Sequence, residues 1–268
     1  MINPRRAFAV VLRQAYLLKG SPARVLPLFS WVAIDIVLWG FITRYLSTIS
    51  SPGFHLVPAL LGAVLLWDFL TRVMQGVTMA FFEDVWSRNF LNIFATPLRI
   101  SEYLSGLVAT SICTSLLGLV VMLLVASLAF GLSFLSFGVA LVPFLLVLFL
   151  TGIALGVFGS GIVLRLGPAS EWLIWPIPSL ISPFVGVFYP LSVLPGWMQA
   201  VAHVLAPSYV FEGMRQVVAG HPAPMGQLAI GAALAVLYLV LACAFFAAVH
   251  RHAIRTGLIA RYSAETVS

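Results

Sequence analysis

Charged residues are scarce in this sequence. Only 8% of its 268 residues are Asp, Glu, Lys or Arg, whereas 62% are hydrophobic. Ordinary soluble domains carry about 25% charged residues, so the composition excludes a soluble globular protein. We therefore predict an all-α integral membrane protein that forms one membrane domain over residues 1–268, with no room for a separate soluble domain.

Cysteine and lysine are also rare. Cys113 and Cys243 each lie within an apolar run, as buried structural thiols do, and this argues against a disulfide or a metal ligand. Lys19 is the sole lysine, and no Gly-rich turn precedes it, so the sequence has no phosphate-binding P-loop. No pair among the five histidines has the spacing of zinc ligands. We expect no catalytic centre, metal or cofactor in this chain.

Long apolar runs are abundant. Each is long enough for a hydrocarbon core about 30 Å thick. The six predicted membrane spans are 26–46, 57–81, 102–127, 136–163, 172–189 and 226–249. An even number of spans places both termini on the same side of the membrane.

Basic residues predict which side that is. Most lie at the termini or in the loops 82–101 and 164–171, whereas only two lie in the predicted outer segments. The inner set is Arg5, Arg6, Arg13, Lys19, Arg24, Arg88, Arg99, Arg165, Arg251, Arg255 and Arg261, and the outer set is Arg44 and Arg215. The positive-inside rule then places both termini in the cytoplasm. This distribution explains the net charge of +6 without nucleic-acid binding.

The N-terminal segment, residues 1–24, has the pattern of an interfacial helix. Phe8, Val11 and Leu12 gather on one side at helical spacing, while Arg6 and Arg13 lie on the opposite side. Such a helix lies on the cytoplasmic membrane surface with its apolar side toward the lipid.

Three charged residues lie inside predicted spans and away from the span ends: Asp35, Asp68 and Arg72. Asp68 and Arg72 are one helical turn apart and can pair on one face. Charges within a membrane are costly and mark function by default. The pair with Asp35 is interpreted as a structural clamp between the first two spans, a polar part of a translocation path, or a proton-coupling site.

The fourth span carries a stripe of small residues. Gly152, Gly156 and Ser160 recur every four residues, and such a stripe lets a neighbouring helix approach closely. We interpret this stripe as a packing surface.

The segment between the second and third spans predicts a short amphipathic helix at the cytoplasmic surface, within residues 82–100. Pro97 ends this segment just before the third span. Its polar side and its aromatic side consist of Glu83, Asp84 and Arg88, and of Trp86, Phe90 and Phe94. Such a helix anchors at the membrane or presents its aromatic residues to a partner.

Prolines interrupt the region from Ser182 to Val218. Pro190 and Pro195 are predicted to end the fifth span and to turn the chain back into a re-entrant outer cap, residues 190–220. This cap would hold two short helices at about 196–204 and 208–219, with Glu212 and Arg215 paired on the second. Phe184, Phe188 and Tyr189 would form an interfacial aromatic belt or a hydrophobic outer gate.

An ordered set of motifs in this region resembles the C-terminal signature of the membrane permeases of type-two ATP-binding-cassette (ABC) exporters. The similarity extends to the N-terminal interfacial helix, the six spans and the cytoplasmic helix after the second span. The motifs are Gly186-Val-Phe-Tyr-Pro190, Leu194-Pro195-Gly196-Trp197, Ala206-Pro207 and Glu212-Gly213-Met214-Arg215.

The resemblance implies a permease subunit in the cytoplasmic (inner) membrane of a bacterium. Two copies would form a dimer, a homodimer more readily than a heterodimer, surrounded by membrane lipids. Two separate ABC ATPase subunits would bind ATP and Mg²⁺ and dock on the cytoplasmic side. The exported substrate would be hydrophobic or amphipathic: a lipid, a lipid-linked saccharide or a drug-like molecule.

In this family a coupling helix inserts into a groove of the ATPase. By resemblance, that helix would contain Glu83, Asp84, Trp86, Arg88 and Phe90. Many family members carry a Glu-Arg pair and a Gly-Thr step before a Thr-Pro. This chain keeps Thr96-Pro97 but departs from the earlier part of the pattern.

Two other functions compete with this one. A secondary transporter driven by protons would use Asp35 and Asp68. A purely structural subunit of a larger complex would have no transport role of its own.

Overall fold

The fold is a bundle of long helices, seen in a computed structural model that describes residues 3–49, 56–87, 89, 92–93, 95–130 and 141–257. Within these ranges, side chains are not described at 22–25, 27–29, 31–32, 47, 49 and 56–59. The longer elements are α1 (Pro4–Lys19), α2 (Pro22–Ile49), α3 (Leu56–Trp86), α5 (Ile100–Phe130), α6 (Leu141–Leu166) and α10 (Met225–Thr256). The shorter elements are η2 (Pro168–Leu173), α7 (Ile177–Val185), η3 (Leu191–Val193), α8 (Gly196–Val204) and α9 (Ala206–Val218). The described part of the chain is all-helical, as predicted.

Among the described residues, four helices have the length and apolar composition to cross a membrane: Leu60–Trp86, Ile100–Phe130, Leu141–Leu166 and Met225–Thr256. They correspond to the second, third, fourth and sixth predicted spans, and they are the helices expected of a membrane protein. α2 covers the first predicted span, although some of its side chains are outside the described set. The predicted start of the fourth span, at 136, also falls outside the described residues.

The fifth predicted span, 172–189, was wrong as one continuous helix. The chain instead forms η2, a turn, and then α7, which has nine residues. At 1.5 Å per residue α7 is about 14 Å long, well short of a hydrocarbon core about 30 Å thick. Pro176 and Pro178 delimit its start, and Gly186, at φ 64°, ends it in a left-handed conformation. The prediction of one continuous span relied on hydropathy and therefore missed these interruptions.

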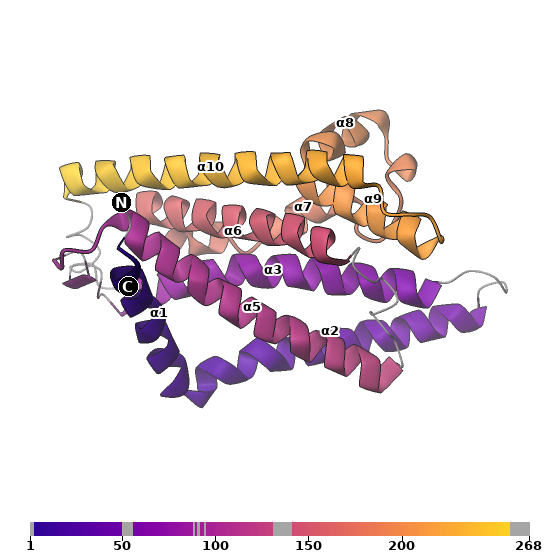
Figure 1. The fold of residues 1–268 in the computed structure, drawn as a ribbon, viewed down its shortest axis with the longest axis horizontal. Coiled ribbons are helices and arrows are strands. Elements are labelled where there is room, and N and C mark those ends of the chain that lie inside the picture. Colours follow the sequence, from indigo (N-terminus) through magenta and orange to yellow (C-terminus); the bar gives the residue numbers. More distant parts are fainter. Residues whose placement is uncertain are drawn as a thin grey trace.

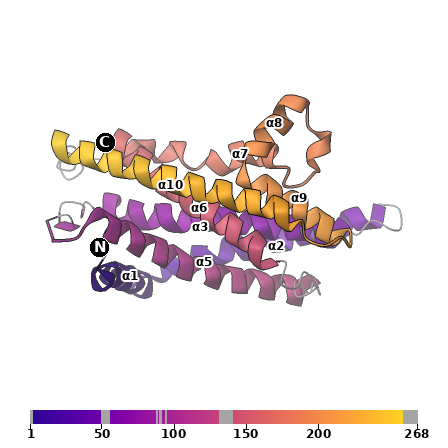
Figure 2. The same cartoon turned by 45° about the horizontal axis from the view of Figure 1, so that its top comes forward.

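α3 lies at the centre of the bundle. α5, α6, α2 and α9 all pack against it, and α10 packs against α6 and α9 (Figures 1 and 2). Val73 and Val77 of α3 are completely buried. By contrast, Leu117, Val120 and Leu124 on the outer side of α5 are about half exposed. This arrangement suits a helix surrounded by others and a periphery that contacts lipid.

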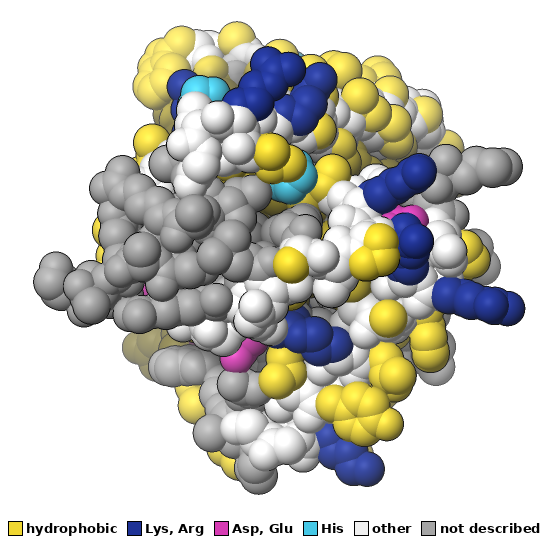
Figure 3. All heavy atoms as spheres, turned by 90° about the vertical axis from the view of Figure 1, so that its left-hand side faces the viewer, with side chains coloured by type: hydrophobic (Ala, Val, Ile, Leu, Met, Phe, Trp, Pro, Cys, Tyr) yellow, Lys and Arg dark blue, Asp and Glu magenta, His cyan; other side chains and the backbone are white. Residues whose placement is uncertain are grey.

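The two ends of the bundle differ in charge. α1 lies across one end of the bundle, the end at which α10 also terminates, while α8 and α9 lie at the other end (Figure 1). Figure 3 shows the α1 end, where many Lys and Arg side chains gather. Arg215 lies on α9, at the opposite end. The segregation of basic residues that the sequence predicts is therefore present along the bundle axis.

The predicted small-residue stripe is a packing surface against α3. A Cβ at Gly156 would lie 2.8 Å from the carbonyl oxygen of Met74 and 2.7 Å from Cβ of Val77. A Cβ at Gly152 would lie 2.8 Å from the carbonyl oxygen of Leu70. Only a hydrogen at these positions allows α6 to lie so close to α3.

We expect Gly156→Ala to lower the free energy of unfolding by about 1–3 kcal/mol, because the new methyl group meets backbone and forces the two helices apart. Thermal unfolding in detergent would measure this. The matched control is Gly226→Ala, on α10, where a Cβ would meet nothing within 4 Å. The control should be neutral or slightly stabilising because alanine favours helix. Equal destabilisation by both substitutions would contradict the packing role.

Candidate functional site

α1 is fixed to the bundle by polar and apolar contacts. The side-chain oxygen of Asn3 caps its first turn by accepting from the Arg5 N–H at 3.1 Å. Val10 is buried against Gly106 of α5, where a Cβ would lie 2.5 Å from Cβ of Val10. The buried Gln14 amide donates to the carbonyl oxygen of Ala80 on α3 at 3.3 Å. The face predicted to be apolar remains exposed at Phe8 and Leu12.

The strongest link between these helices is the carboxylate of Asp84. It is completely buried near the end of α3, and the guanidinium of Arg13 on α1 lies 2.5 Å from it. The Tyr103 hydroxyl, on α5, donates to its other oxygen at 2.7 Å. A buried ion pair is tolerated only with close contact and further hydrogen bonds, and here Arg13 lies against one oxygen while Tyr103 donates to the other. One side chain thus joins α1, α3 and α5, and we call this the Asp84 junction.

A second buried carboxylate, Glu102, lies at the start of α5. It accepts from the backbone N–H of Arg99 at 2.9 Å, as a glutamate at the third helical position does in a capping box. Its other oxygen accepts from the N–H of Asn3 at 3.0 Å, and Arg6 lies 3.6 Å away. Arg6 also donates to the carbonyl oxygen of Pro97 at 2.5 Å. Glu102 therefore caps α5 and holds the N-terminus of α1.

The predicted coupling helix differs from the structure in its first part. Glu83, Asp84 and Trp86 belong to the last turns of α3 and not to a separate helix. No helix breaker follows Phe81, and the charge of Asp84 is satisfied where it lies, so α3 continues beyond the predicted end of the second span. Arg88 and Phe90 lie outside the described residues.

Trp86 connects α3 to η2. Its indole Nε1–H donates to the Glu171 carboxylate at 2.9 Å, and 48% of its surface remains exposed. Phe82, one turn earlier, packs against both Trp86 and Trp175. Trp86 thus presents aromatic surface at the basic end while its position is fixed from two sides.

The intramembrane charges gather where α2, α3 and α5 meet. Asp68 of α3 interacts electrostatically with Asp35 of α2 and with Arg72 one turn along α3. Arg72 passes over Gly118 of α5, where a Cβ would lie 2.6 Å from its Cδ. Among the described residues, Asp68 Oδ2 is buried without a hydrogen-bond partner. Asp68 therefore lies within electrostatic reach of both other charges.

At the other end, the predicted short outer helices are present as α8 (Gly196–Val204) and α9 (Ala206–Val218). Arg215 and Glu212 form the predicted ion pair at 2.8 Å. Arg215 also donates to the carbonyl oxygen of Gly186 at 2.7 Å, which the sequence did not indicate. The arginine thus ties α9 to the left-handed residue that ends α7. Pro190 and Pro195 precede η3 and α8, respectively.

The three predicted outer aromatic residues contact different partners. Phe188 stacks on Trp39 of α2, with ring centroids 5.0 Å apart and planes within 14°. Phe184 meets Trp197 of α8 edge to face at 6.1 Å. The Tyr189 hydroxyl donates to the carbonyl oxygen of Pro183 at 2.7 Å. These contacts connect α2, α7 and α8 at this end.

Sequence reasoning missed Tyr103, Glu102 and Trp39. The capping role of Glu102 could have been predicted from its position three residues after Arg99. No sequence pattern indicates that Arg13 pairs with Asp84, 71 positions away, or that Trp39 stacks on Phe188. Within the described ranges, no group of three His, Cys, Asp or Glu side chains could hold a metal ion. Compared with models of known protein families and with curated protein sequences, the chain matches neither a family model nor a curated sequence.

We expect Arg13→Met to lower the free energy of unfolding by about 3 kcal/mol, because it leaves the buried Asp84 carboxylate without its counter-charge. Adding Asp84→Asn should recover most of this loss, since the amide is neutral and still accepts from Tyr103. Chemical denaturation in detergent would measure both. Arg5→Met, an exposed change on the same helix, is the control and should be nearly neutral. A double variant no more stable than Arg13→Met would contradict the ion-pair explanation.

Replacing Arg215 should destabilise the α9 end of the bundle locally. Arg215→Met removes both the ion pair and the donor to Gly186, so backbone amides near residues 186–195 should exchange hydrogen faster by about tenfold. Glu212→Gln removes only the ion pair and should have a smaller effect. Equal effects of the two substitutions would mean that the bond to Gly186 does not stabilise this region. Hydrogen exchange followed by mass spectrometry makes the measurement.

Proposed function

We propose that the chain is the permease subunit of an ATP-driven exporter of the type-two ABC class. The observation that carries the proposal is the Asp84 junction. It rigidly couples a surface helix, α1, to two long helices with the composition of membrane spans, α3 and α5. A movement of α1 would therefore be transmitted directly to α3 and α5.

The partner in this proposal is an ABC ATPase, two copies per complex, which binds ATP and Mg²⁺. It would contact the end of α3, with Trp86 as an exposed aromatic group, together with α1. Glu83, Arg88 and Phe90 would complete the contact. Because Asp84 is bound by both Arg13 and Tyr103, movement of either α1 or the end of α3 would displace α5 as well.

Two copies of the chain would form the complete permease in the cytoplasmic membrane of a bacterium, with both termini cytoplasmic. The broken segment of η2 and α7 would take the place of a fifth continuous span. The aromatic contacts around Phe188 and Phe184, with the cap formed by α8 and α9, would close the outer end of the pathway. The substrate would be hydrophobic or amphipathic: a lipid, a lipid-linked saccharide or a drug-like molecule. The small number of charges along the described helices supports this class of substrate.

A proton-driven secondary transporter is the second candidate. One observation favours it: Asp68 carries a buried carboxylate oxygen that has no hydrogen-bond partner among the described residues. Asp35 lies within its electrostatic reach. Carboxylates so placed within membrane helices form proton relays in pumps and transporters.

The energy source distinguishes the two candidates. We expect uptake of fluorescent lipid analogues or hydrophobic dyes into inside-out vesicles to stop when ATP is removed, and to continue when a protonophore collapses the proton gradient. The vesicles would contain the chain together with the P-loop ATPase that copurifies with it from its native membrane. Vesicles with the ATPase alone are the control.

The opposite result would support the proton-driven candidate. Transport without ATP that is lost in Asp68→Asn, or a purified chain that carries no ATPase, would contradict the proposed function. Loss of ATP-driven transport in Asp68→Asn with ATP hydrolysis unchanged would place Asp68 on the substrate path within the ABC model.

A further inference from the structure

A groove runs along one side of α1 at the basic end of the bundle. It has a volume of about 330 Å³. α1 forms one wall, and the segment that precedes α5 forms the other, with Tyr103 of α5 between them. We call this the α1 groove, and its lining is Arg6, Ala9, Val10, Arg13, Ile93, Thr96, Pro97, Leu98 and Tyr103.

The mouth of the α1 groove is positively charged although each arginine has a carboxylate partner. Glu102 and Asp84 are 1% and 0% exposed, whereas the side chains of Arg6 and Arg13 are 40% and 31% exposed. A molecule in the groove therefore meets the guanidinium groups and not the carboxylates beneath them. A guanidinium has five N–H donors, so an arginine in an ion pair can bind a second acceptor.

The groove opens toward the aqueous side of α1. At 100° per residue, Arg6 and Arg13 lie on the side of the helix opposite Val11 and Ala15, the flank that continues the apolar face predicted to contact lipid. Figure 3 shows this end of the molecule from outside the bundle, with basic side chains facing the viewer. An occupant would therefore approach from the aqueous phase and not from the bilayer.

We propose that the α1 groove binds an acidic amphipathic helix of a cytoplasmic protein. Arg6 and Arg13 are seven residues apart, or about 10.5 Å along α1, which matches carboxylates at positions i and i+7 of a facing helix. Between them, Ala9, Val10 and Leu98 form an apolar floor for side chains at i+3 and i+4. The groove thus matches a helix in both charge and periodicity.

The inference rests on the proposed function, because that proposal places the basic end of the bundle in the cytoplasm. It adds the chemistry of the segment that docks there. The ATPase subunit is the partner that the proposed function supplies. The described lining of the groove belongs to α1, to Ile93, to residues 96–98 and to Tyr103. It can be tested without identifying that subunit, so the two proposals can fail separately.

The test uses two synthetic helical peptides with the same apolar residues. One carries glutamates seven residues apart and the other carries lysines at those positions. We expect the full-length chain, in nanodiscs of zwitterionic lipid, to bind the glutamate peptide at least tenfold more tightly than the lysine peptide. Raising the salt concentration should weaken that binding. Fluorescence anisotropy of labelled peptides gives the affinities.

Ala9→Trp fills the groove and should weaken binding of the glutamate peptide at least tenfold. The matched control is Ala15→Trp, an exposed alanine on the opposite side of the same helix, which should leave binding unchanged. Arg6→Gln should weaken it about threefold, since exposed ion pairs contribute little each. Glu102 keeps its two backbone donors in that variant, so the chain should remain folded.

Three results would overturn the inference: equal binding of both peptides, equal loss in Ala9→Trp and Ala15→Trp, or complete competition by phosphatidylglycerol in the nanodiscs. The last would mean that the groove takes an anionic lipid headgroup. None of these binding results decides whether transport depends on ATP, and ATP dependence is the test of the proposed function. Conversely, if the chain binds the glutamate peptide but transports without ATP, the inference about the α1 groove holds and the proposed ABC function is wrong.

Discussion

The buried carboxylate of Asp84 is the constraint on which the basic end of this protein depends. A charge without exposure to water must be bound by other groups, and here those groups come from two other helices, at Arg13 and Tyr103. Satisfying one side chain therefore fixes the surface helix α1, the end of α3 and the start of α5 relative to one another. Glu102 adds a second fixed point close by.

The opposite end follows the same physical rule with different groups. There α7 ends at Gly186 in a left-handed conformation, and the carbonyl oxygen of this buried residue is bound by Arg215 of α9. Between the two ends the contacts are apolar and close, as at Gly156 against Met74 and Val77. Polar fixation at the ends and close packing in the middle suit a protein that moves as a set of rigid helices.

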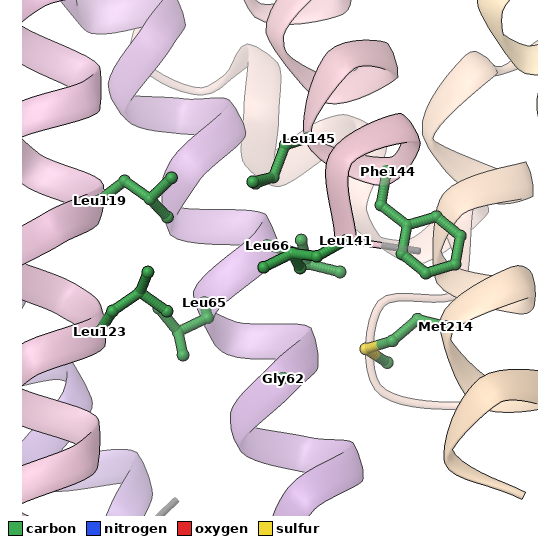
Figure 4. A pocket seen from close by; sticks show the side chains of 9 residues that line it. All are labelled: Gly62, Leu65, Leu66, Leu119, Leu123, Leu141, Phe144, Leu145 and Met214. Atoms are coloured by element: carbon green, nitrogen blue, oxygen red, sulfur yellow. The ribbon is translucent and has the colours of Figure 1, made fainter. Parts of the chain in front are cut away.

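A small apolar cavity lies in the half of the bundle nearer α9. Leucines of α3, α5 and α6 line it, together with Phe144 and Met214, and it holds about 20 Å³ (Figure 4). That volume is close to the size of a single water molecule, and the lining is almost wholly apolar. Any molecule larger than water would therefore enter this cavity only if the surrounding helices separated.

The sequence by itself determined the all-helical class, the long apolar helices and the two short helices α8 and α9, because hydropathy and proline positions act locally. It also determined the Glu212–Arg215 pair, which lies within one helical turn. Only the tertiary structure decided that α3 continues through Asp84, that Arg13 binds it, and that Phe188 stacks on Trp39. These contacts join residues 71 and 149 positions apart. Such pairing depends on how whole helices pack, and no local pattern encodes it.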